Sequence, residues 1–296
     1  MKWKIGDVTI TKIAEIESTS HATWILPALT AESLARPELA WCKPHFAQDD
    51  GQVHLSVHAL VIESQGRRII VDTCVGNDKN IRMTGWNKRQ GPFLSDLAAA
   101  GFATESIDTV LCTHLHVDHV GWNTRLENGK WVPTFPNAKY VMSRIDHDHW
   151  AAMTKKPDTE AYQVNTYNDS VLPIVEAKKA EFVSGEHGMC GCLTLKPTPG
   201  HTPGQIRVDL ASKDRRAIFA GDALHNPVQV PLWKWNSRFC EDLDLARKSR
   251  HTLLADCAEQ GALLMPAHFA PPHAAYVKAK GDRFELDWDW DNSRGR

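Results

Sequence analysis

The feature that most constrains this chain is residues 113–121, where four side chains able to bind a metal fall within six residues. These side chains are His114, His116, Asp118 and His119. The apolar residues 109–112 come directly before them and predict a buried strand. A strand that ends in such a loop presents imidazole and carboxylate groups together at the edge of a sheet, where they can bind a cation. With 15 histidines in 296 residues, a polar loop that gathers histidines by chance is the alternative.

Three later residues with the same ligand chemistry favour a metal site over a chance cluster. His201 lies in the motif Pro-Gly-His-Thr-Pro-Gly, Asp222 in Phe-Ala-Gly-Asp, and His268 in Met-Pro-Ala-His. Each follows a short apolar run, and two of them lie among glycines and prolines, which predicts tight loops at strand ends. Together with the first cluster they make five histidines and two aspartates, enough for two metal ions with open coordination positions.

The ordered set H-x-H-x-D-H, then G-H, then G-D, then a late histidine resembles the metallo-β-lactamase superfamily. The match runs from the first predicted strands to His268 and covers most of the chain. The sequence itself supports a mixed α/β protein with two similar halves, each with strands first and helices after them. The four-layer αββα sandwich is what the resemblance implies.

The resemblance also implies a ligand for every position of a two-metal site. It assigns His114, His116 and His201 to one ion, Asp118, His119 and His268 to the other, and Asp222 to a bridge between them. Two divalent transition-metal ions, Zn²⁺ before others, lie about 3.5–4 Å apart in such sites and lower the pKa of a shared water from about 15.7 toward roughly 7. The bridging hydroxide is then the expected nucleophile, so that no serine or cysteine is required, and Asp118 could pass a proton to the leaving group.

Within the superfamily, the chain resembles the branch of N-acyl-homoserine lactonases and methyl-parathion-hydrolase-like enzymes. The length, two long loops and the single bridging Asp222 carry this resemblance. Many of those lactonases have a tyrosine three residues after the bridging aspartate, where this chain has His225. His225 could hydrogen-bond the substrate oxyanion in place of the tyrosine, or line the site without a role. In this respect the chain resembles the methyl-parathion-hydrolase-like enzymes more than the lactonases.

The function implied is hydrolysis of a small ester, either a lactone, as in quorum-quenching lactonases, or an aryl ester. The alternatives are a phosphotriester hydrolase of the methyl-parathion type and a non-hydrolytic oxygenase or sensor with the same fold. A sensor is expected to have lost metal ligands, and all seven are present in this sequence.

Aromatic residues are the candidates for contacts with the substrate. Trp86, Trp122, Trp233 and Trp235 fall in predicted loops on or near the metal side of the sheet, where large apolar groups would form a pocket for acyl chains or aryl rings. Each could instead be a core residue. Asp72 ends the predicted strand 68–72, and the resemblance implies that its carboxylate steadies the metal loop from behind the ligands. A turn cap is the alternative for Asp72.

Most of the remaining elements follow from hydrophobic periodicity. Residues 3–5 and 8–13 predict an opening hairpin around Gly-Asp. Residues 18–50 have poor periodicity and three prolines but many apolar side chains, which predicts a flap or a dimerisation arm, or alternatively a loop packed on its own core. Helices are predicted over 92–100, 144–153, 158–176 with a bend near Pro173, and 243–260, and residues 263–266 are predicted as the last core strand. His147 and His149 in the second helix are predicted to be structural or surface residues.

Composition limits the partners and the compartment. The net charge of −2 gives no electrostatic basis for binding nucleic acid or an anionic membrane surface. Seven cysteines without a C-x-x-C spacing favour reduced thiols in a cytoplasmic enzyme, and Cys190 and Cys192 are expected to be loop thiols and not a strained disulfide. No apolar segment of a secretory signal is visible, and none approaches the roughly 18 residues of a membrane helix. We therefore expect one domain over 1–296 with a small-molecule substrate, and leave a homodimer open.

Overall fold

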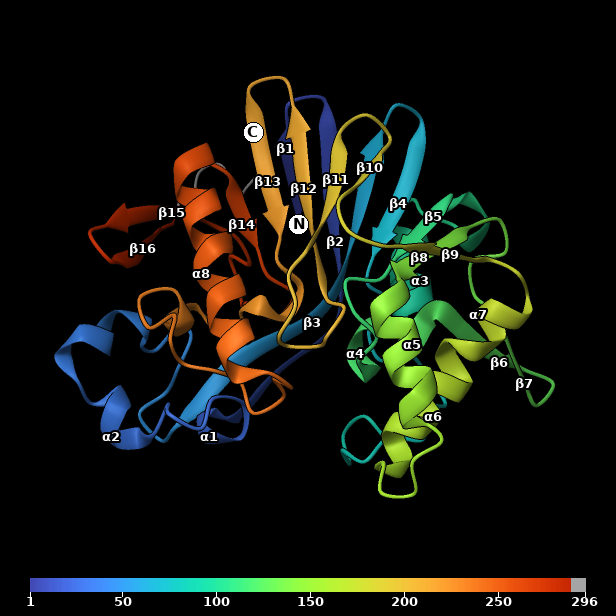
Figure 1. Ribbon diagram of the computed structural model, residues 1–296, viewed down its shortest axis with the longest axis horizontal. Coiled ribbons are helices and arrows are strands. Elements are labelled where there is room, and N and C mark those ends of the chain that lie inside the picture. The colour runs from blue at the N-terminus through green and yellow to red at the C-terminus, as the bar shows by residue number, and fades with distance from the viewer. Residues whose placement is uncertain (289–296) are drawn as a thin grey trace.

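The computed structural model describes residues 1–288, and residues 289–296 lie outside the described part. Within residues 1–288, two seven-stranded sheets face each other and helices cover the outer face of each sheet (Figure 1). The first sheet has the order β1-β2-β3-β4-β5-β8-β9, with β1 (Lys2–Ile5), β2 (Val8–His21), β3 (Gln52–Ser64), β4 (Arg67–Val71), β5 (Thr109–Leu111), β8 (Lys139–Ser143) and β9 (Ala180–Val183). The second has the order β10 (His187–Met189), β11 (Leu193–Pro197), β12 (Ile206–Ser212), β13 (Arg215–Phe219), β14 (Leu263–Met265), β15 (Ala275–Lys280) and β16 (Arg283–Asp287).

The helices divide between the two outer faces. Those against the first sheet are α3 (Phe93–Ala99), α5 (Arg144–Met153), α6 (Ala161–Ser170) and α7 (Leu172–Glu176), and α8 (Leu243–Gln260) lies against the second. The smaller elements are α1 (Ala22–Ile25), α2 (Ala31–Leu34), α4 (Val117–Val120), the short 3-10 helices η1 (Pro37–Cys42), η2 (Thr104–Ser106), η3 (Gly121–Asn123), η4 (Gly221–Ala223) and η5 (Pro227–Gln229), and a hairpin of β6 (Thr124–Glu127) and β7 (Lys130–Pro133).

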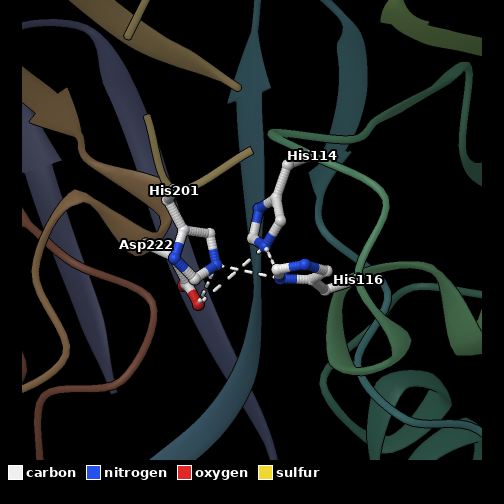
Figure 2. Close-up of side chains that lie close together, drawn as sticks. All are labelled: His114, His116, His201 and Asp222. Carbon is white, nitrogen blue, oxygen red and sulfur yellow. Dashed lines mark hydrogen bonds and ion pairs between the residues drawn. The ribbon is translucent and has the colours of Figure 1, made fainter. Parts of the chain in front are cut away.

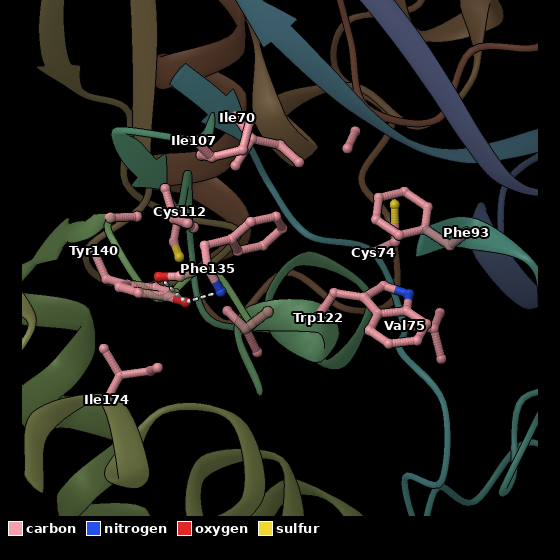
Figure 3. Packing of buried hydrophobic residues seen from close by; sticks show 14 of the residues in the cluster. Ile70, Cys74, Val75, Phe93, Ile107, Cys112, Trp122, Phe135, Tyr140 and Ile174 are labelled. Carbon is pink, nitrogen blue, oxygen red and sulfur yellow. Dashed lines mark hydrogen bonds between the residues drawn. The ribbon is translucent and has the colours of Figure 1, made fainter. Parts of the chain in front are cut away.

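Alternation along the strands builds the layers. In β4, Ile69 and Val71 pack with apolar residues of the second sheet, whereas Ile70 packs with the helices on the outer face (Figure 3). This period of two is what a strand buried on both faces requires. A third cluster joins the outer face of the second sheet to Leu253 and Leu254 of α8. The order helix, sheet, sheet, helix confirms the predicted αββα sandwich.

Local signals explain the helix ends that were predicted correctly. The side chain of Asp242 accepts hydrogen bonds from the first backbone amides of α8, and Gly261 ends this helix in the left-handed conformation at φ +61°. Ser143 caps α5 in the same way as Asp242. The expected helix over 158–176 is two helices, because the chain breaks at Val171, and Pro173 lies in the first turn of α7.

Two predictions about the strands were wrong. Residues 263–266 are not the last core strand, because β15 and β16 follow and extend the same sheet. The opening hairpin is also longer than predicted, because β2 pairs with β3 as far as His21 opposite Gln52. The end of β2 and much of β15 and β16 consist of polar residues, so hydrophobic periodicity does not mark these strands. As predicted, Cys190 and Cys192 are free thiols.

Residues 22–47 form an arm with a small apolar cluster of its own. Leu26, Leu29, Leu34 and Leu39 are buried there together with Val228 and Ala270 from the body of the molecule. Trp24 and Trp41 remain 38% and 40% exposed. The burial supports the alternative that this loop packs on a core, and a flap or dimerisation role stays a prediction. No helix among the described residues is both long and apolar enough to cross a membrane.

Two glycines allow the loop of residues 113–121, which carries the first metal ligands, to pack closely against the segment that follows β4. A Cβ at Gly121 would lie 1.8 Å from the carbonyl oxygen of Val75, and one at Gly76, at φ +79°, would lie 2.8 Å from the carbonyl carbon of Gly121. The amide of Gly121 donates to the carbonyl of Cys74 at 2.8 Å across this contact. Only glycine allows two backbones to approach this closely.

We expect Gly121→Ala to lower the free energy of unfolding by about 1–3 kcal/mol, the usual cost of overpacking a closed contact. Gly85→Ala is the control, because a Cβ at Gly85 meets nothing within 4 Å, and this change should stay within about 0.5 kcal/mol. Urea unfolding of the two variants and the parent measures both values. Equal stability of the two variants would show that the contact at Gly121 can yield.

Candidate metal centre

Four strand ends bring the predicted ligands to one place. His114 and His116 follow β5, His201 lies between β11 and β12, Asp222 follows β13 and His268 follows β14. Strands β4 and β5 are parallel, as are β13 and β14, so that their carboxyl ends point to the same edge of each sheet. Figure 2 shows His114 and His116 converging with His201 and Asp222 from separate segments of the chain.

The first cluster consists of His114, His116, His201 and Asp222, with one ligand atom of each within 4.8 Å of the others. The Nδ1 atom of His116 lies 3.1 Å from Nε2 of His114 and 2.9 Å from Nε2 of His201. Asp222 Oδ2 lies 3.3 Å from Nε2 of His201. Three ring nitrogens and one carboxylate oxygen therefore face a common point.

The second cluster consists of Asp118, His119 and His268. Asp118 lies 3.7 Å from Nε2 of His119 through Oδ1 and 3.5 Å from Nε2 of His268 through Oδ2. Its side chain is 14% exposed, against 4% for Asp222, so Asp118 is on the more open side of the site.

Asp222 lies between the two clusters. Its Oδ1 atom is 3.3 Å from Nε2 of His119 and 3.1 Å from Nε2 of His268. Its Oδ2 atom is 3.3 Å from Nε2 of His201 in the first cluster and 3.2 Å from Nε2 of His268. Although burial opposes ionisation, the imidazoles of His268, His119 and His225 hold the pKa of this carboxyl well below its usual range. A carboxylate with one oxygen toward each cluster is the arrangement that a bridging ligand needs.

The residues fit two divalent cations on chemical grounds. Nε2 of His119 and Oδ1 of Asp222 are buried and lie 3.3 Å apart, but neither forms a well-aligned hydrogen bond among residues 1–288. Buried polar atoms are normally paired, so such atoms indicate a missing partner. Burial lowers the pKa of His116 to about 4 and the pKa values of His114 and His201 well below the usual value, which keeps their lone pairs free for a metal.

Most of these histidines are oriented by a hydrogen bond at their other ring nitrogen. Nδ1 of His119 lies 2.9 Å from Asp72 Oδ2, and Nδ1 of His268 lies 3.1 Å from the carbonyl oxygen of Ser56. Asp72 also accepts from the amide of Thr113 at 2.7 Å, so it holds the backbone and a side chain of the metal loop together. This confirms the prediction that Asp72 steadies the loop. Burial disfavours charged His119, but the carboxylates of Asp222 and Asp72 raise its pKa well above the usual value.

His201 has a sulfur atom as its outer partner. Nδ1 of His201 lies 3.8 Å from Sγ of Cys240, a buried thiol whose pKa burial raises to about 11. The positive charge of Arg250, which is fully buried, acts against burial and favours the ionised form of this thiol. Cys240 therefore contributes to the surroundings of the first cluster, although no motif or periodicity in the sequence singles it out.

His225 lies beside both clusters without belonging to either. Its Nε2 atom is 3.1 Å from Asp222 Oδ2, and its ring stacks on His268 at 5.6 Å and tilts against His201 at 5.0 Å. Burial lowers its pKa, which leaves a neutral imidazole at neutral pH. His147 and His149 lie outside both clusters, as predicted, and contact Tyr167 and Glu241 respectively.

The tryptophans do not share one environment. The prediction that Trp122 contacts the substrate was wrong, because its ring is 4% exposed, stacks on Phe93 at 5.7 Å and lies in the core behind the metal loop (Figure 3). Trp86 packs, partly buried, on the same core cluster, and Trp233 packs on His251 of α8 at 4.6 Å. Substrate contacts of Trp86 and Trp233 stay predictions.

Two buried charged residues that support the site were missed. Glu15 accepts hydrogen bonds from the amide of Val75 and from the indole of Trp122, both at 2.7 Å, and pairs with Arg89 at 2.7 Å. Arg250 of α8 donates to the carbonyl oxygens of three residues that follow Asp222: Ala223, Trp233 and Trp235. Glu15 lies among the apolar residues of β2 and Arg250 in the polar run 247–251 of α8. Hydrophobic periodicity gives no signal for a buried charge whose partners come from distant loops.

Comparison with known families follows the geometry. The family model described as the metallo-beta-lactamase superfamily matches residues 54–282, and the chain belongs to this superfamily. Among curated proteins, the chain is 28% identical over 140 residues to YobT of Bacillus subtilis (strain 168), which is described as uncharacterized. This match covers 45% of the chain and 53% of YobT, so the chain matches about half the length of that relative.

Several solved structures share the fold over nearly the whole chain. AidC, described as a dizinc quorum-quenching lactonase with a bound product, N-hexnoyl-L-homoserine, has a TM-score of 0.79 at 22% identity and covers 97% of this chain and 96% of its own. AbOPH, described as a hydrolase in the beta lactamase superfamily, has a TM-score of 0.80 at 23% identity with the same coverage. A probable metal-dependent hydrolase from Staphylococcus aureus has a TM-score of 0.75 at 18% identity and covers 97% and 99%. At these identities the likeness shows the common fold.

We expect Cys240→Ala to weaken metal binding, because it leaves Nδ1 of His201 without an acceptor, and outer partners of metal-binding histidines are worth about 10–100-fold in affinity. Cys240→Ser keeps an acceptor and should recover most of the affinity. Cys257→Ala, at a buried position in α8 among apolar neighbours, is the control and should bind as the parent does.

Chelator competition measures the affinities of these three variants. At saturating metal, Cys240→Ala should hydrolyse substrate within about tenfold of the parent, because the thiol is not the nucleophile in a metal-dependent site. Unchanged metal affinity in Cys240→Ala would make the sulfur contact incidental.

Proposed function

We propose that this protein is a binuclear metal-dependent hydrolase of small esters, with a lactone or an aryl ester as substrate. The observation that carries the proposal is the position of Asp222, which turns one carboxylate oxygen to each of two clusters of buried imidazoles. Two adjacent cation sites that share a carboxylate are characteristic of two-metal hydrolysis.

The chain supplies a complete set of ligands for this role. His114, His116 and His201 would hold one ion, Asp118, His119 and His268 the other, and Asp222 would bridge them. When bound there, two divalent ions, Zn²⁺ before others, supply an activated water at neutral pH and polarise the reacting oxygen of the substrate. No protein nucleophile is needed for this chemistry.

Asp118 and His225 are the residues that we assign to proton transfer and charge stabilisation. Asp118 is the more exposed carboxylate, and a group on the open side can deliver a proton to the departing alcohol. His225 is buried and neutral, and neither of its ring nitrogens has a hydrogen-bond partner in the described chain, so either of them can carry the single N–H. A neutral imidazole held beside the reacting centre can donate a hydrogen bond to the substrate oxyanion.

The fold shared with AidC, described as a lactonase, supports a cyclic ester as substrate. His225, at a position where many lactonases of this branch have tyrosine, favours a second candidate, a phosphotriester of the methyl-parathion type. Both candidate functions use the same two-metal chemistry. They differ only in which substrate the residues around the metal site accept.

The metal content tests the binuclear site. The purified protein should hold about two transition-metal ions per chain, and Asp222→Ala should lose both metal and activity, because this carboxylate touches both clusters. Asp209→Ala removes a carboxylate that pairs with Arg207 and Lys196 away from the site, and it should keep two ions. Elemental analysis without chelators measures the content, and one ion or none in the parent would contradict the binuclear site.

His225 is tested by substitution and a small substrate panel. His225→Ala should keep both ions and lose about 10–1,000-fold in rate, the range for one lost oxyanion donor or proton-transfer group. His225→Tyr should also keep the ions and should raise the rate on acyl-homoserine lactones relative to aryl esters. The comparison needs rates on lactones, aryl esters and phosphotriesters for three proteins. Metal loss in His225→Ala would make the residue a ligand, and unchanged rates in both variants would make it a bystander.

A further inference from the structure

Asp146 in the first turn of α5 is the most completely buried carboxylate near the metal loops, with 0% of the residue exposed. Its Oδ2 atom accepts a hydrogen bond from the amide of Leu115 at 3.0 Å, and Oδ1 accepts one from the amide of Gly204 at 2.8 Å. It forms no ion pair with a lysine or arginine among residues 1–288. The carboxylate is therefore committed to two backbone amides.

Those amides belong to different halves of the molecule. Leu115 lies between His114 and His116 in the loop after β5 of the first sheet, and Gly204 follows His201 in the loop that leads to β12 of the second sheet. One side chain thus connects the two loops that provide all the histidines of the first cluster.

The position of Asp146 in its helix makes this use unusual. Ser143 caps α5, so that Asp146 is the third residue of the helix, where an acidic side chain commonly reaches back to the amide of the capping residue. Here both carboxylate oxygens reach outward to neighbouring loops. The carboxylate therefore does not cap its own helix, and it serves instead as a hydrogen-bond acceptor for both loops.

The contact at Gly204 is close enough to exclude a side chain. A Cβ at this position would lie 2.3 Å from the backbone nitrogen of Asp146 and 2.6 Å from Oγ of Ser143. Gly204 therefore lets the His201 loop reach the start of α5, and this approach brings its amide within hydrogen-bond distance of the carboxylate.

Two further residues of α5 contact the same loops or a neighbour of them. The ring of Trp150 packs edge to face on His116 at 5.5 Å, and Nε2 of His149 lies 3.1 Å from the carboxylate of Glu241, whose amide donates to the carbonyl oxygen of His201 at 3.2 Å. A direct backbone hydrogen bond also joins the loops near the strands, from the amide of Ile206 to the carbonyl oxygen of Thr113 at 2.8 Å. Loss of Asp146 would leave that link in place and release the part of each loop that carries the ligands.

We propose that Asp146 is a positioning residue that sets the spacing between the His114–His116 loop and the His201 loop, and so controls the affinity of the first cluster for its ion. The inference rests on the proposed two-metal function. Asp118, His119 and His268 of the second cluster make no hydrogen bond to Asp146 in the described chain, so their ion should be held independently of this carboxylate.

The test measures each cluster alone. His268→Ala leaves the first cluster complete, and His116→Ala leaves the second complete, so Asp146→Ala is added to each of these two backgrounds. Binding of Co²⁺ is followed by visible absorption and by elemental analysis. We expect Asp146→Ala to weaken binding about 10–100-fold in the His268→Ala background and to change it less than about threefold in the His116→Ala background.

Three further substitutions, each made in the same two backgrounds, complete the experiment. Asp146→Asn keeps one acceptor oxygen and should fall between the parent and Asp146→Ala. Gly204→Ala moves the same loop from the other side and should reproduce the selective loss. Ser143→Ala is the matched control, because it alters the helix cap beside the same contact but keeps both hydrogen bonds of the Asp146 carboxylate, and it should leave the affinity within about threefold.

The outcomes separate this inference from the proposed function. Equal weakening in both backgrounds, or no weakening in either, would overturn the role of Asp146, because a merely structural residue would not distinguish the clusters. A parent protein that binds fewer than two ions would instead contradict the binuclear function, whatever the variants show.

Discussion

The structure depends on one buried carboxylate and the five imidazoles around it. Asp222 lies within 3.9 Å of His114, His119, His201, His225 and His268, which are drawn from loops of both sheets. So many polar groups are costly to bury together unless they share cations, because each would otherwise be desolvated without a partner. The glycine contact between Gly76 and Gly121 and the outer hydrogen bonds of Asp72 serve to keep this cluster assembled.

The fold and the metal ligands could both be predicted from the sequence, because both depend on short apolar strands that end in loops. Each ligand follows a short apolar run that ends a strand, and only a few residue types bind transition metals. His114 and His268 can therefore be recognised as candidate ligands, although they lie far apart in the sequence. The family resemblance added the pairing of ligands into two clusters, which residue types alone leave open. The two close-packed groups of side chains agree with that pairing.

What could not be predicted is what holds those ligands. Glu15, Asp146 and Arg250 are buried charged residues, and most of their partners lie in loops that no local pattern identifies. Trp122 was misplaced because periodicity cannot tell a pocket wall from a core residue when both follow the same loop. The last two strands were missed because their exposed ends are polar and the sheet accepts them at its edge.

The chain order of the ligands has a consequence for synthesis. Every residue of the first cluster has been made once the ribosome passes Asp222, whereas the second cluster waits for His268, which is 46 residues further along. A nascent chain can therefore offer a site for one cation before the other site exists. The loops of the two sheets that carry the first cluster are therefore complete in the chain before β14 and β15 are translated.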